Sequence, residues 1–347
     1  MSEKVAVVLF NLGGPDCKEA IRPFLLNFFM DKNIIRVPIP FRCLIASMIA
    51  NKRSKREAGE SYGELGDKSP LLENTQAKSD ALQKVLPDNY KTFVCMRYWH
   101  PMAPQVVREI RNWGADKIVI LPLYPQFSTT TTWSSLGVWE KAIHEAGMRD
   151  IETSTICCYP VNKGFVKASA ENVRQQYDQA LKDGYESPRV LFSAHGLPEK
   201  VVKDGDPYQW QCEETAKAIA NELGIENLDW EICYQSRVGP MKWIGPSTEE
   251  AIEKAANEQK AIIILPHAFT QEHVETLVEL DIEYKEIAEE HGLKGYYRAQ
   301  TVGVHPTYIE GMAELVKKHT DKTGVYAEGF ESICPSGFSD CCMKKAA

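Results

Sequence analysis

Lys4-Val5-Ala6-Val7-Val8-Leu9-Phe10-Asn11-Leu12-Gly13-Gly14-Pro15 decides the fold: it is a continuous apolar run that ends in small, turn-forming residues. Such a run is typical of a strand that is buried on both faces of a parallel sheet. Leu191-Phe192-Ser193-Ala194-His195-Gly196-Leu197-Pro198 is similar to its second half, and residues 118–122 are similar to residues 262–266. The two similarities indicate that the chain consists of two related halves.

Apolar runs alternate with helical patterns on both sides of this stretch. Strands are predicted at residues 5–10, 91–96, 117–121, 152–157, 189–193, 230–233 and 261–265, and helices at residues 104–113, 164–181, 208–223 and 272–291. This alternation predicts an α/β protein of two similar Rossmann-like domains, with parallel sheets and a cleft between them. We expect an N-terminal domain at residues 1–160, a C-terminal domain at residues 161–325 and a cysteine-rich extension at residues 326–347.

Composition restricts the class of partner and the compartment. The chain has 347 residues, of which 44% are hydrophobic and 25% are charged, as in ordinary globular proteins. Its formal net charge of -8 argues against a nucleic-acid partner. The first predicted strand begins too early for a signal peptide, and no run of eighteen apolar residues occurs. We therefore expect a cytoplasmic protein.

Two segments that follow predicted strands carry side chains suited to proton and metal chemistry. His195 follows one strand and has small neighbours. After another strand comes His273, and Glu272, Glu275 and Glu279 share one side of the helix predicted at 272–291. A histidine that only caps its strand, and an acidic helix face that is only solvated, are the structural alternatives. No dinucleotide or Walker A motif occurs after any predicted strand.

Six motifs occur in the order found in one enzyme family. They are Asn11-Leu12-Gly13-Gly14-Pro15, Arg97-Tyr98-Trp99-His100-Pro101, Leu121-Pro122-Leu123-Tyr124-Pro125-Gln126-Phe127-Ser128, Ser193-Ala194-His195-Gly196-Leu197-Pro198, Gln235-Ser236-Arg237-Val238-Gly239-Pro240, and residues 270–279 followed by Leu280-Asp281-Ile282-Glu283-Tyr284. From the first strand to about residue 320 the chain resembles the ferrochelatases, which have a chelatase-like fold. The resemblance implies a lyase that inserts Fe²⁺ into protoporphyrin IX and so completes haem biosynthesis. A coproporphyrin ferrochelatase, a cobalt chelatase, and a porphyrin or haem carrier without turnover are the alternatives.

The resemblance also assigns roles to residues. His195 and Glu275 correspond to the family's active-site pair, which would meet the Fe²⁺ substrate, with His273 and Glu279 in the same acidic path. The residues that match porphyrin-contacting positions are Arg53, Tyr62 and Ser69, together with the pocket-lining Tyr98 and Trp243. Leu12 favours protoporphyrin, because coproporphyrin-using relatives tend to have tyrosine there. Glu272 departs from the aspartate that is frequent in relatives.

The C-terminal extension contains Cys334, Cys341 and Cys342 in a segment that is poor in apolar residues. Several thiols on a polar tail suggest a metal centre, and four thiolates suit either a [2Fe–2S] cluster or structural zinc. The resemblance implies the cluster, with one internal thiol as fourth ligand. We expect Cys158 rather than Cys157, because side chains alternate along a strand and Cys157 continues the buried one. The adjacent pair at 341 and 342 departs from relatives, which usually separate these ligands.

Residues 34–50 are apolar with basic residues between them, which is typical of a buried helix. The resemblance instead implies that this region is the lip of the porphyrin pocket and makes a peripheral contact with the inner face of the cell membrane. A homodimer is also expected, with the C-terminal extension as its contact.

Overall fold

The computed structural model describes residues 3–57, 62–63, 65–237 and 241–346, so Val238-Gly239-Pro240, the end of one motif, lies outside the described residues. The chain forms two compact units. Unit 1 contains residues 1–158 and 313–331, and unit 2 contains residues 159–312 and 332–345. The predicted division at residue 160 does not include this exchange of segments near the C-terminus.

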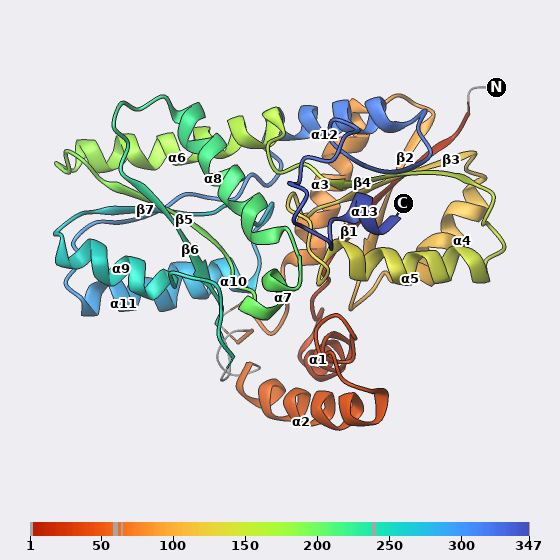
Figure 1. The fold of residues 1–347 in the computed structure, drawn as a ribbon, viewed down its shortest axis with the longest axis horizontal. Helices are drawn as coiled ribbons and strands as arrows, with labels where there is room; N and C mark the ends of the chain where they lie inside the picture. Colours follow the sequence, from red (N-terminus) through yellow and green to blue (C-terminus); the bar gives the residue numbers. More distant parts are fainter. Residues whose placement is uncertain (1–2, 58–61, 64, 238–240, 347) are drawn as a thin grey trace. The chain divides into compact units, whose positions relative to one another are not determined.

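Unit 1 contains a parallel sheet with the strand order β2-β1-β3-β4-β9 (Figure 1). Its strands are β1 (Val5–Asn11), β2 (Tyr90–Met96), β3 (Lys117–Pro122), β4 (Glu152–Cys158) and β9 (Gly324–Ala327). All seven residues of β1 are buried, as its continuous apolar run predicts, since strands pair with it on both sides. β9 brings residues 313–331 into unit 1 because it pairs with β4.

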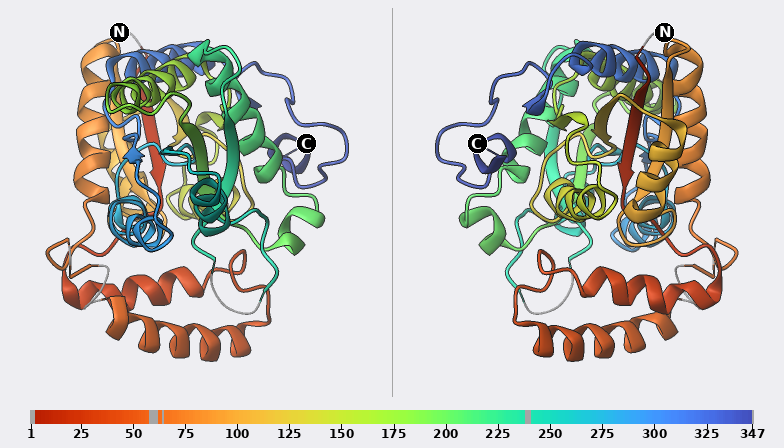
Figure 2. Two further views of the ribbon diagram at one scale, coloured as in Figure 1. Left: turned by 90° about the vertical axis from the view of Figure 1, so that its left-hand side faces the viewer. Right: turned by 90° about the vertical axis from the view of Figure 1, so that its right-hand side faces the viewer.

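The helices of unit 1 follow its strands along the chain. A 3₁₀ turn at Lys18–Ala20 leads into α1 (Ile21–Phe29), and the others are α2 (Ile39–Glu57), α3 (Leu71–Val85), α4 (Ala103–Trp113) and α5 (Thr132–Glu145). α1 and α2 lie side by side (Figure 2). The chain passes from unit 2 back to unit 1 within α12 (Pro306–His319).

Unit 2 contains a second parallel sheet, with the order β6-β5-β7-β8. Its strands are β5 (Arg189–His195), β6 (Trp230–Gln235), β7 (Ile262–Pro266) and β8 (Tyr296–Arg298). Its helices are α6 (Lys163–Lys182), α7 (Glu199–Lys203), α8 (Tyr208–Leu223), α9 (Thr248–Asn257), α10 (Val274–Leu277) and α11 (Tyr284–Glu290), with a π turn at Glu279–Glu283, and the chain ends with α13 (Cys342–Ala346).

Alternate residues of β5 bury the two faces of this sheet. Val190 and Phe192 pack with α6 and α8, whereas Leu191 packs with α9 and α11 on the opposite face. The helices accordingly cover both faces of the sheet (Figure 1). A strand covered on both faces exposes no side chain to solvent until it ends, so the first solvent-accessible chemical group of β5 is at its carboxyl end.

The two sheets repeat one topology. In each unit the first strand in chain order lies between the second and third, and the fourth lies beyond the third. The two similar stretches of sequence fall at matching positions, at the ends of β1 and β5 and along β3 and β7. The seven predicted strands and the prediction of two related α/β halves are confirmed; β8 and β9 were not predicted.

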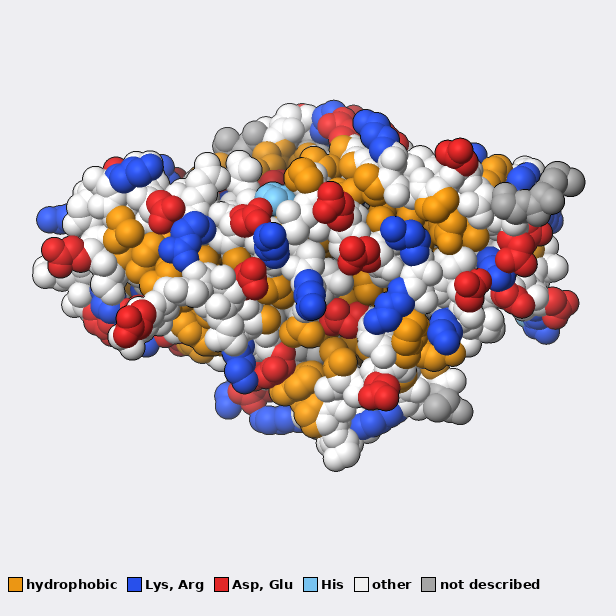
Figure 3. All heavy atoms as spheres, turned by 90° about the horizontal axis from the view of Figure 1, so that it is seen from above, with side chains coloured by type: hydrophobic (Ala, Val, Ile, Leu, Met, Phe, Trp, Pro, Cys, Tyr) orange, Lys and Arg blue, Asp and Glu red, His pale blue; other side chains and the backbone are white. Residues whose placement is uncertain are grey.

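No helix in the described ranges is long and apolar enough to cross a membrane. On the face seen in Figure 3, acidic and basic side chains are interspersed.

Gly14, in the loop that follows β1, approaches Ser69 closely. A Cβ at Gly14 would lie 2.5 Å from both Cβ and Oγ of Ser69. Gly14→Ala should therefore lower the free energy of unfolding by about 1–3 kcal/mol through overpacking. Gly137→Ala, inside α5, is the control: nothing lies within 4 Å of its new Cβ, and a helix interior favours alanine. Chemical denaturation measures both, and equal stabilities would contradict the prediction.

Candidate active site

His195 ends the central strand of unit 2. β5 is paired with β6 on one side and β7 on the other, and its first six residues are buried. His195 is the first residue of the strand to reach solvent, with a side chain that is 36% exposed. The strand thus presents one imidazole at the carboxyl edge of the sheet, where open α/β sheets place their chemistry.

Gly196 and Trp243 shape the turn that follows His195. A Cβ at Gly196 would lie 3.0 Å from the carbonyl oxygen of Gln235 and 3.2 Å from Cε3 of Trp243. The backbone of Trp243 also forms a bridge with Pro198. The predicted pocket residue Trp243 therefore lies beside the His195 turn, which needs glycine because there is no room for a side chain.

Glu275 lies next to His195, as the sequence predicts. Its Oε2 is 3.4 Å from Nδ1 of His195. The preceding His273 caps α10. Its ring Nδ1 accepts a hydrogen bond from the backbone N–H of Glu275 at 3.1 Å. The backbone N–H of His273 donates to Oγ1 of Thr276 at 3.0 Å. Burial lowers the pKa of His273, which favours the neutral ring that a cap acceptor requires. His273 thus fixes the turn that carries Glu275.

Glu279 is held by two donors from the end of β6. Oγ of Ser236 donates to its Oε2 at 2.6 Å, and Nε2 of Gln235 donates to the same oxygen at 3.1 Å. Burial and the neighbouring charge of Glu275 raise the pKa of Glu279 to about 7. A carboxyl group with this pKa can take up or release a proton near neutral pH.

The prediction of one straight helix with an acidic stripe is wrong. α10 ends at Leu277, and the π turn at Glu279–Glu283 changes the angle between successive side chains before α11 begins. Glu272 lies ahead of α10 and binds Nη1 of Arg298 at 2.9 Å and the N–H of Thr301 at 2.8 Å. Although burial raises the pKa of Glu272, the hydrogen bond and charge of Arg298 lower it. Glu272 therefore belongs to a structural ion pair in this structure.

Three predicted residues of unit 1 lie near the loop after β1. The N–H of Tyr98 donates to the carbonyl oxygen of Leu12 at 2.9 Å, and the N–H of Ser69 donates to that of Pro15 at 2.8 Å. Tyr62 and Ser69 are buried. Arg53, on α2, places its guanidinium 5.6 Å from the centre of the Phe29 ring.

Tyr98 belongs to a buried polar cluster that the sequence did not reveal. Its hydroxyl donates to Oδ2 of Asp31 at 2.7 Å, and Nη2 of Arg97 donates to the same oxygen at 2.9 Å. Burial raises the pKa of Asp31, but hydrogen bonds led by that of Ser134 lower it overall. Asp31 follows an apolar segment without any motif, so no sequence signal distinguishes it from a surface acid.

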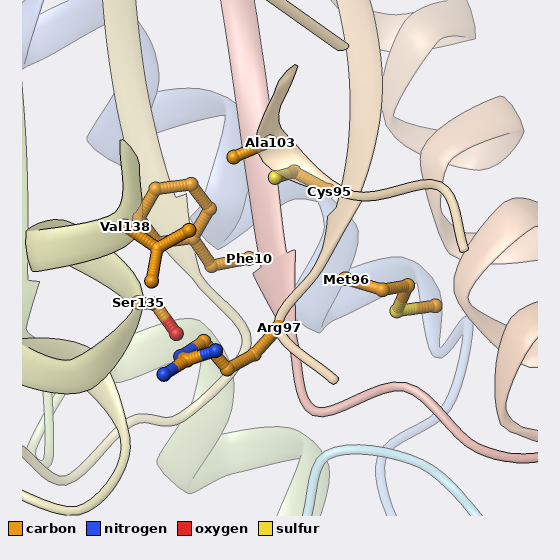
Figure 4. A pocket seen from close by; sticks show the side chains of 7 residues that line it. All are labelled: Phe10, Cys95, Met96, Arg97, Ala103, Ser135 and Val138. Carbon is orange, nitrogen blue, oxygen red and sulfur yellow. The ribbon is translucent and has the colours of Figure 1, made fainter. Parts of the chain in front are cut away.

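A small cavity lies behind this cluster in unit 1 (Figure 4). It is lined by Phe10, Cys95, Met96, Arg97, Ala103, Ser135 and Val138. Its volume of about 10 Å³ has room for about one water molecule, so a porphyrin does not fit there.

Comparison with known proteins shows the family. The family model described as ferrochelatase matches residues 4–320. A ferrochelatase of Hyphomonas neptunium is 47% identical, over 98% of this chain and 95% of the relative, and one of Caulobacter vibrioides is 44% identical, over 100% and 99%. The chain belongs to the ferrochelatase family.

Membership of the ferrochelatase family confirms the predicted enzyme class, a lyase that inserts a metal into a porphyrin, and the predicted place at the end of haem biosynthesis. Among solved structures, SirB from Bacillus subtilis with Fe³⁺ matches with a TM-score of 0.52 at 14% identity, over 92% of this chain and 96% of that chain. That similarity confirms the chelatase-like fold.

The two internal cysteines do not follow strand alternation. β4 has a register shift between Ile156 and Cys158, and Sγ of Cys157 lies 3.8 Å from Sγ of Cys158. The argument that the two side chains point to opposite sides is therefore wrong, because a β-bulge turns one residue of the strand. The choice of Cys158 over Cys157 stays a prediction.

The three cysteines of the tail belong to unit 2, and all three are buried. A hydrogen bond with Cys334 lowers the pKa of Cys341 to about 5, which favours the thiolate that binds metals. Nε2 of Gln211 lies 3.2 Å from Sγ of Cys334 and donates to it. Over the described ranges, however, no three His, Cys, Asp or Glu side chains are close enough together to hold one metal ion. The pair of Cys334 and Cys341 fits a thiolate centre, and the full set of four ligands is not assembled.

The raised pKa of Glu279 predicts a pH-dependent stability. In the unfolded chain this carboxyl has its ordinary pKa of 4.5, and in the folded protein its pKa is about 7. Its contribution to stability is therefore full below pH 4.5 and is lost as the pH rises through 7. Glu279→Gln removes the charge, while its amide oxygen can still accept from Ser236 and Gln235.

We expect Glu279→Gln to raise the melting temperature at pH 8 and to change it little at pH 5. Glu286→Gln is the matched control, because Glu286 is exposed on α11. Thermal denaturation at the two pH values measures both variants. An equal shift at pH 5 and pH 8 would show that Glu279 does not titrate near pH 7.

Proposed function

We propose that this chain inserts Fe²⁺ into protoporphyrin IX with His195, Glu275 and Glu279 as its reacting groups. The observation that carries the proposal is the 3.4 Å separation of His195 Nδ1 and Glu275 Oε2 at the edge of the unit 2 sheet. An imidazole beside a carboxylate provides both a proton acceptor and a site for a divalent cation, the two functions that metal insertion requires.

Proton removal follows from the arrangement of these groups. Two pyrrole N–H protons must leave the ring, and the neutral imidazole of His195 accepts them one at a time. Glu275, beside His195, stabilises the imidazolium that forms and takes the proton on. Glu279, with its pKa of about 7, accepts the proton from Glu275 and returns it to water at neutral pH.

Metal delivery uses the same edge of the sheet. His195 and Glu275 are about one-third exposed, so hydrated Fe²⁺ can reach them. One nitrogen and one carboxylate hold the ion weakly compared with a closed cage of four ligands, and the ion can therefore pass to the porphyrin. The candidate porphyrin contacts are Leu12, Tyr62, Ser69 and Trp243, which the family resemblance assigns.

Substitution of His195 tests this mechanism. His195→Ala should lower kcat for haem formation by at least ~100-fold, because it removes the proton acceptor. The dissociation constant for protoporphyrin, followed by fluorescence quenching, should change by less than about threefold, since docking does not use the proton acceptor. His291→Ala, at the exposed residue that follows α11, is the control. Near-normal turnover by His195→Ala would exclude the assigned role.

An anaerobic assay of protoporphyrin metallation by Fe²⁺ separates the alternatives. Protoporphyrin that binds but keeps its metal-free absorption bands in the presence of Fe²⁺ would indicate a carrier. Faster metallation of coproporphyrin III than of protoporphyrin IX would indicate a coproporphyrin ferrochelatase. Leu12 would then not indicate which porphyrin is the substrate. Preference for Co²⁺ over Fe²⁺ would indicate a cobalt chelatase.

We also propose that α2 makes a peripheral contact with the membrane. Ala46 and Ala50 are fully buried, while Phe41, Leu44 and Met48 are more than 60% exposed on the other side of the helix. Lys52 and Lys55 follow on the same helix, where they can meet anionic lipid headgroups. An apolar outer face with basic flanks suits the surface of the inner leaflet. The expected homodimer stays a prediction, which sedimentation at micromolar concentration would test.

We propose, further, that the C-terminal tail binds a [2Fe–2S] cluster through Cys334, Cys341, Cys342 and the internal Cys158. The tail has few apolar residues, and polar contacts join it to the rest of unit 2. Oγ of Ser339 donates to the carbonyl oxygen of Asp204 at 3.2 Å, and the N–H of Asp340 donates to that of Gly205 at 3.1 Å. A bound cluster would supply ordering energy to a segment that gains little from burial.

Cys334→Ser tests the cluster independently of turnover. The wild-type protein should be reddish brown and should contain about two irons and two sulfides per chain, and the variant should lose the colour and melt at a lower temperature. Cys95→Ser, at a buried cysteine of β2, should keep the colour. A colourless wild-type protein with one zinc would replace the cluster by a zinc site. Colour lost in Cys157→Ser but kept in Cys158→Ser would reverse the choice of the internal ligand.

A further inference from the structure

We propose that Gln235 is the positioning residue that holds Glu275 and Glu279 against His195. The inference deepens the proposed function and rests on it, because it explains how the three reacting groups are kept together. Gln235 is the last residue of β6 and lies within one of the family-like motifs, yet neither the sequence nor the mechanism above gives it a role. Its side chain is fully buried.

The backbone of Gln235 is tied to the strand that carries His195. The two residues are register partners in the parallel pairing of β5 and β6. The N–H of Gly196 then donates to the carbonyl oxygen of Gln235 at 2.9 Å. Since backbone pairs within a sheet move little, the position of Gln235 relative to His195 is fixed.

The side chain of Gln235 is tied to the segment that carries the two acids. Nε2 donates to the backbone carbonyl oxygen of Glu275 at 2.9 Å and to Oε2 of Glu279 at 3.1 Å. Both N–H groups of the amide therefore donate hydrogen bonds, one to α10 and one to the π turn. α10 has only four residues and the π turn only five, so hydrogen bonds within these short segments do little to fix their position. The hydrogen bonds from Gln235 therefore help to position both segments.

Two hydroxyl groups fix which way the amide of Gln235 points. Oγ of Ser193, on β5, donates to Oε1 of Gln235 at 2.9 Å, and Oγ1 of Thr248, on α9, lies 3.0 Å from the same Oγ. Because Ser193 donates its one proton to Gln235, its oxygen can accept from Thr248, whose hydroxyl group also lies 3.5 Å from Sγ of Cys233. A flipped amide would place its oxygen against the Glu275 carbonyl and the Glu279 carboxylate, and its NH₂ against Ser193. The contact of Oε1 with Ser193 and the contacts of Nε2 with Glu275 and Glu279 therefore fix the orientation of the amide.

Ser236 adds a second contact from the same strand end. Its φ of 63° lies in the left-handed region, which is unfavourable for serine and directs the hydroxyl to Oε2 of Glu279. β6 thus supplies two adjacent donors to one carboxylate. Ser236 holds Glu279 alone, whereas Gln235 links Glu279, Glu275 and the His195 strand.

Gln235→Met tests the proposal, because methionine fills a similar volume without hydrogen bonds. We expect kcat for iron insertion to fall ~10- to 100-fold, since displacement of reacting groups by about 1 Å costs up to that much. KM for protoporphyrin should change by less than about threefold, because Gln235 positions the acids rather than the ring. A structure of the variant should show His195 Nδ1 and Glu275 Oε2 separated by about 1 Å more than the 3.4 Å of the wild-type protein.

Three further variants separate positioning from general stability. Thr248→Val should lower kcat, and Thr248→Ser, which keeps the hydroxyl group, should restore it. Thr215→Val is the matched control: its hydroxyl group is also fully buried in a helix of unit 2, but it donates to the carbonyl oxygens of Pro160 and Gln211. This control should lose stability without loss of kcat.

The outcomes distinguish this proposal from the proposed function. If Gln235→Met is folded and keeps kcat within twofold of wild type, or if its His195–Glu275 distance is unchanged, Gln235 is not the positioning residue. Equal losses of kcat in Thr248→Val and Thr215→Val would also overturn it. If instead His195→Ala retains its rate, the proposed mechanism fails, while the distance measured in the Gln235→Met structure still decides whether Gln235 positions the acids.

Discussion

The parallel pairing of β5 with β6 and β7 is the constraint on which the candidate site depends. It buries every residue of β5 before His195 and so places the imidazole at the first solvent-accessible position. The same pairing puts Gln235 beside His195 and turns its amide toward Glu275 and Glu279. The acids themselves lie on short, irregular segments that hold their shape poorly. The sheet therefore holds the site rigid, and the hydrogen bonds of Gln235 connect the two acids to it.

The two units share one sheet topology but have different residues at the ends of their central strands. β1 and β5 are the matching central strands, and the stretch that ends β1 carries Gly13 and Gly14 where the stretch that ends β5 carries His195 and Gly196. The glycines of unit 1 allow close packing of backbone, and a Cβ at Gly14 has no room beside Ser69. The histidine of unit 2 instead supplies chemistry. The shared fold therefore does not determine the function of either unit. The side chain at the end of the central strand does.

The features that the sequence predicted are those set by local pattern. Long apolar runs identified seven strands because burial on both faces leaves a strong signal. β8 and β9, with three and four residues, are too short to show one. The helix at 272–291 was predicted as continuous because its apolar period persists across the π turn, whereas the break depends on Gln235, Ser236 and Arg298 from elsewhere in the chain. The family resemblance supplied His195 and Glu275, and no local pattern could have supplied Gln235 or Asp31, whose roles arise only from tertiary contacts.

Burial, more than residue type, decides what His195, His267 and His273 can do. His267 follows β7 much as His195 follows β5, but it is only 1% exposed, and burial lowers its pKa to about 4. Its Nε2 lies 3.2 Å from the carbonyl oxygen of Cys212, so it acts as a neutral donor within the core. His273 is neutral for the same reason and caps α10. His195 alone among these three combines access to solvent with a carboxylate at its ring nitrogen, and that combination lets an imidazole accept a proton and give it up again.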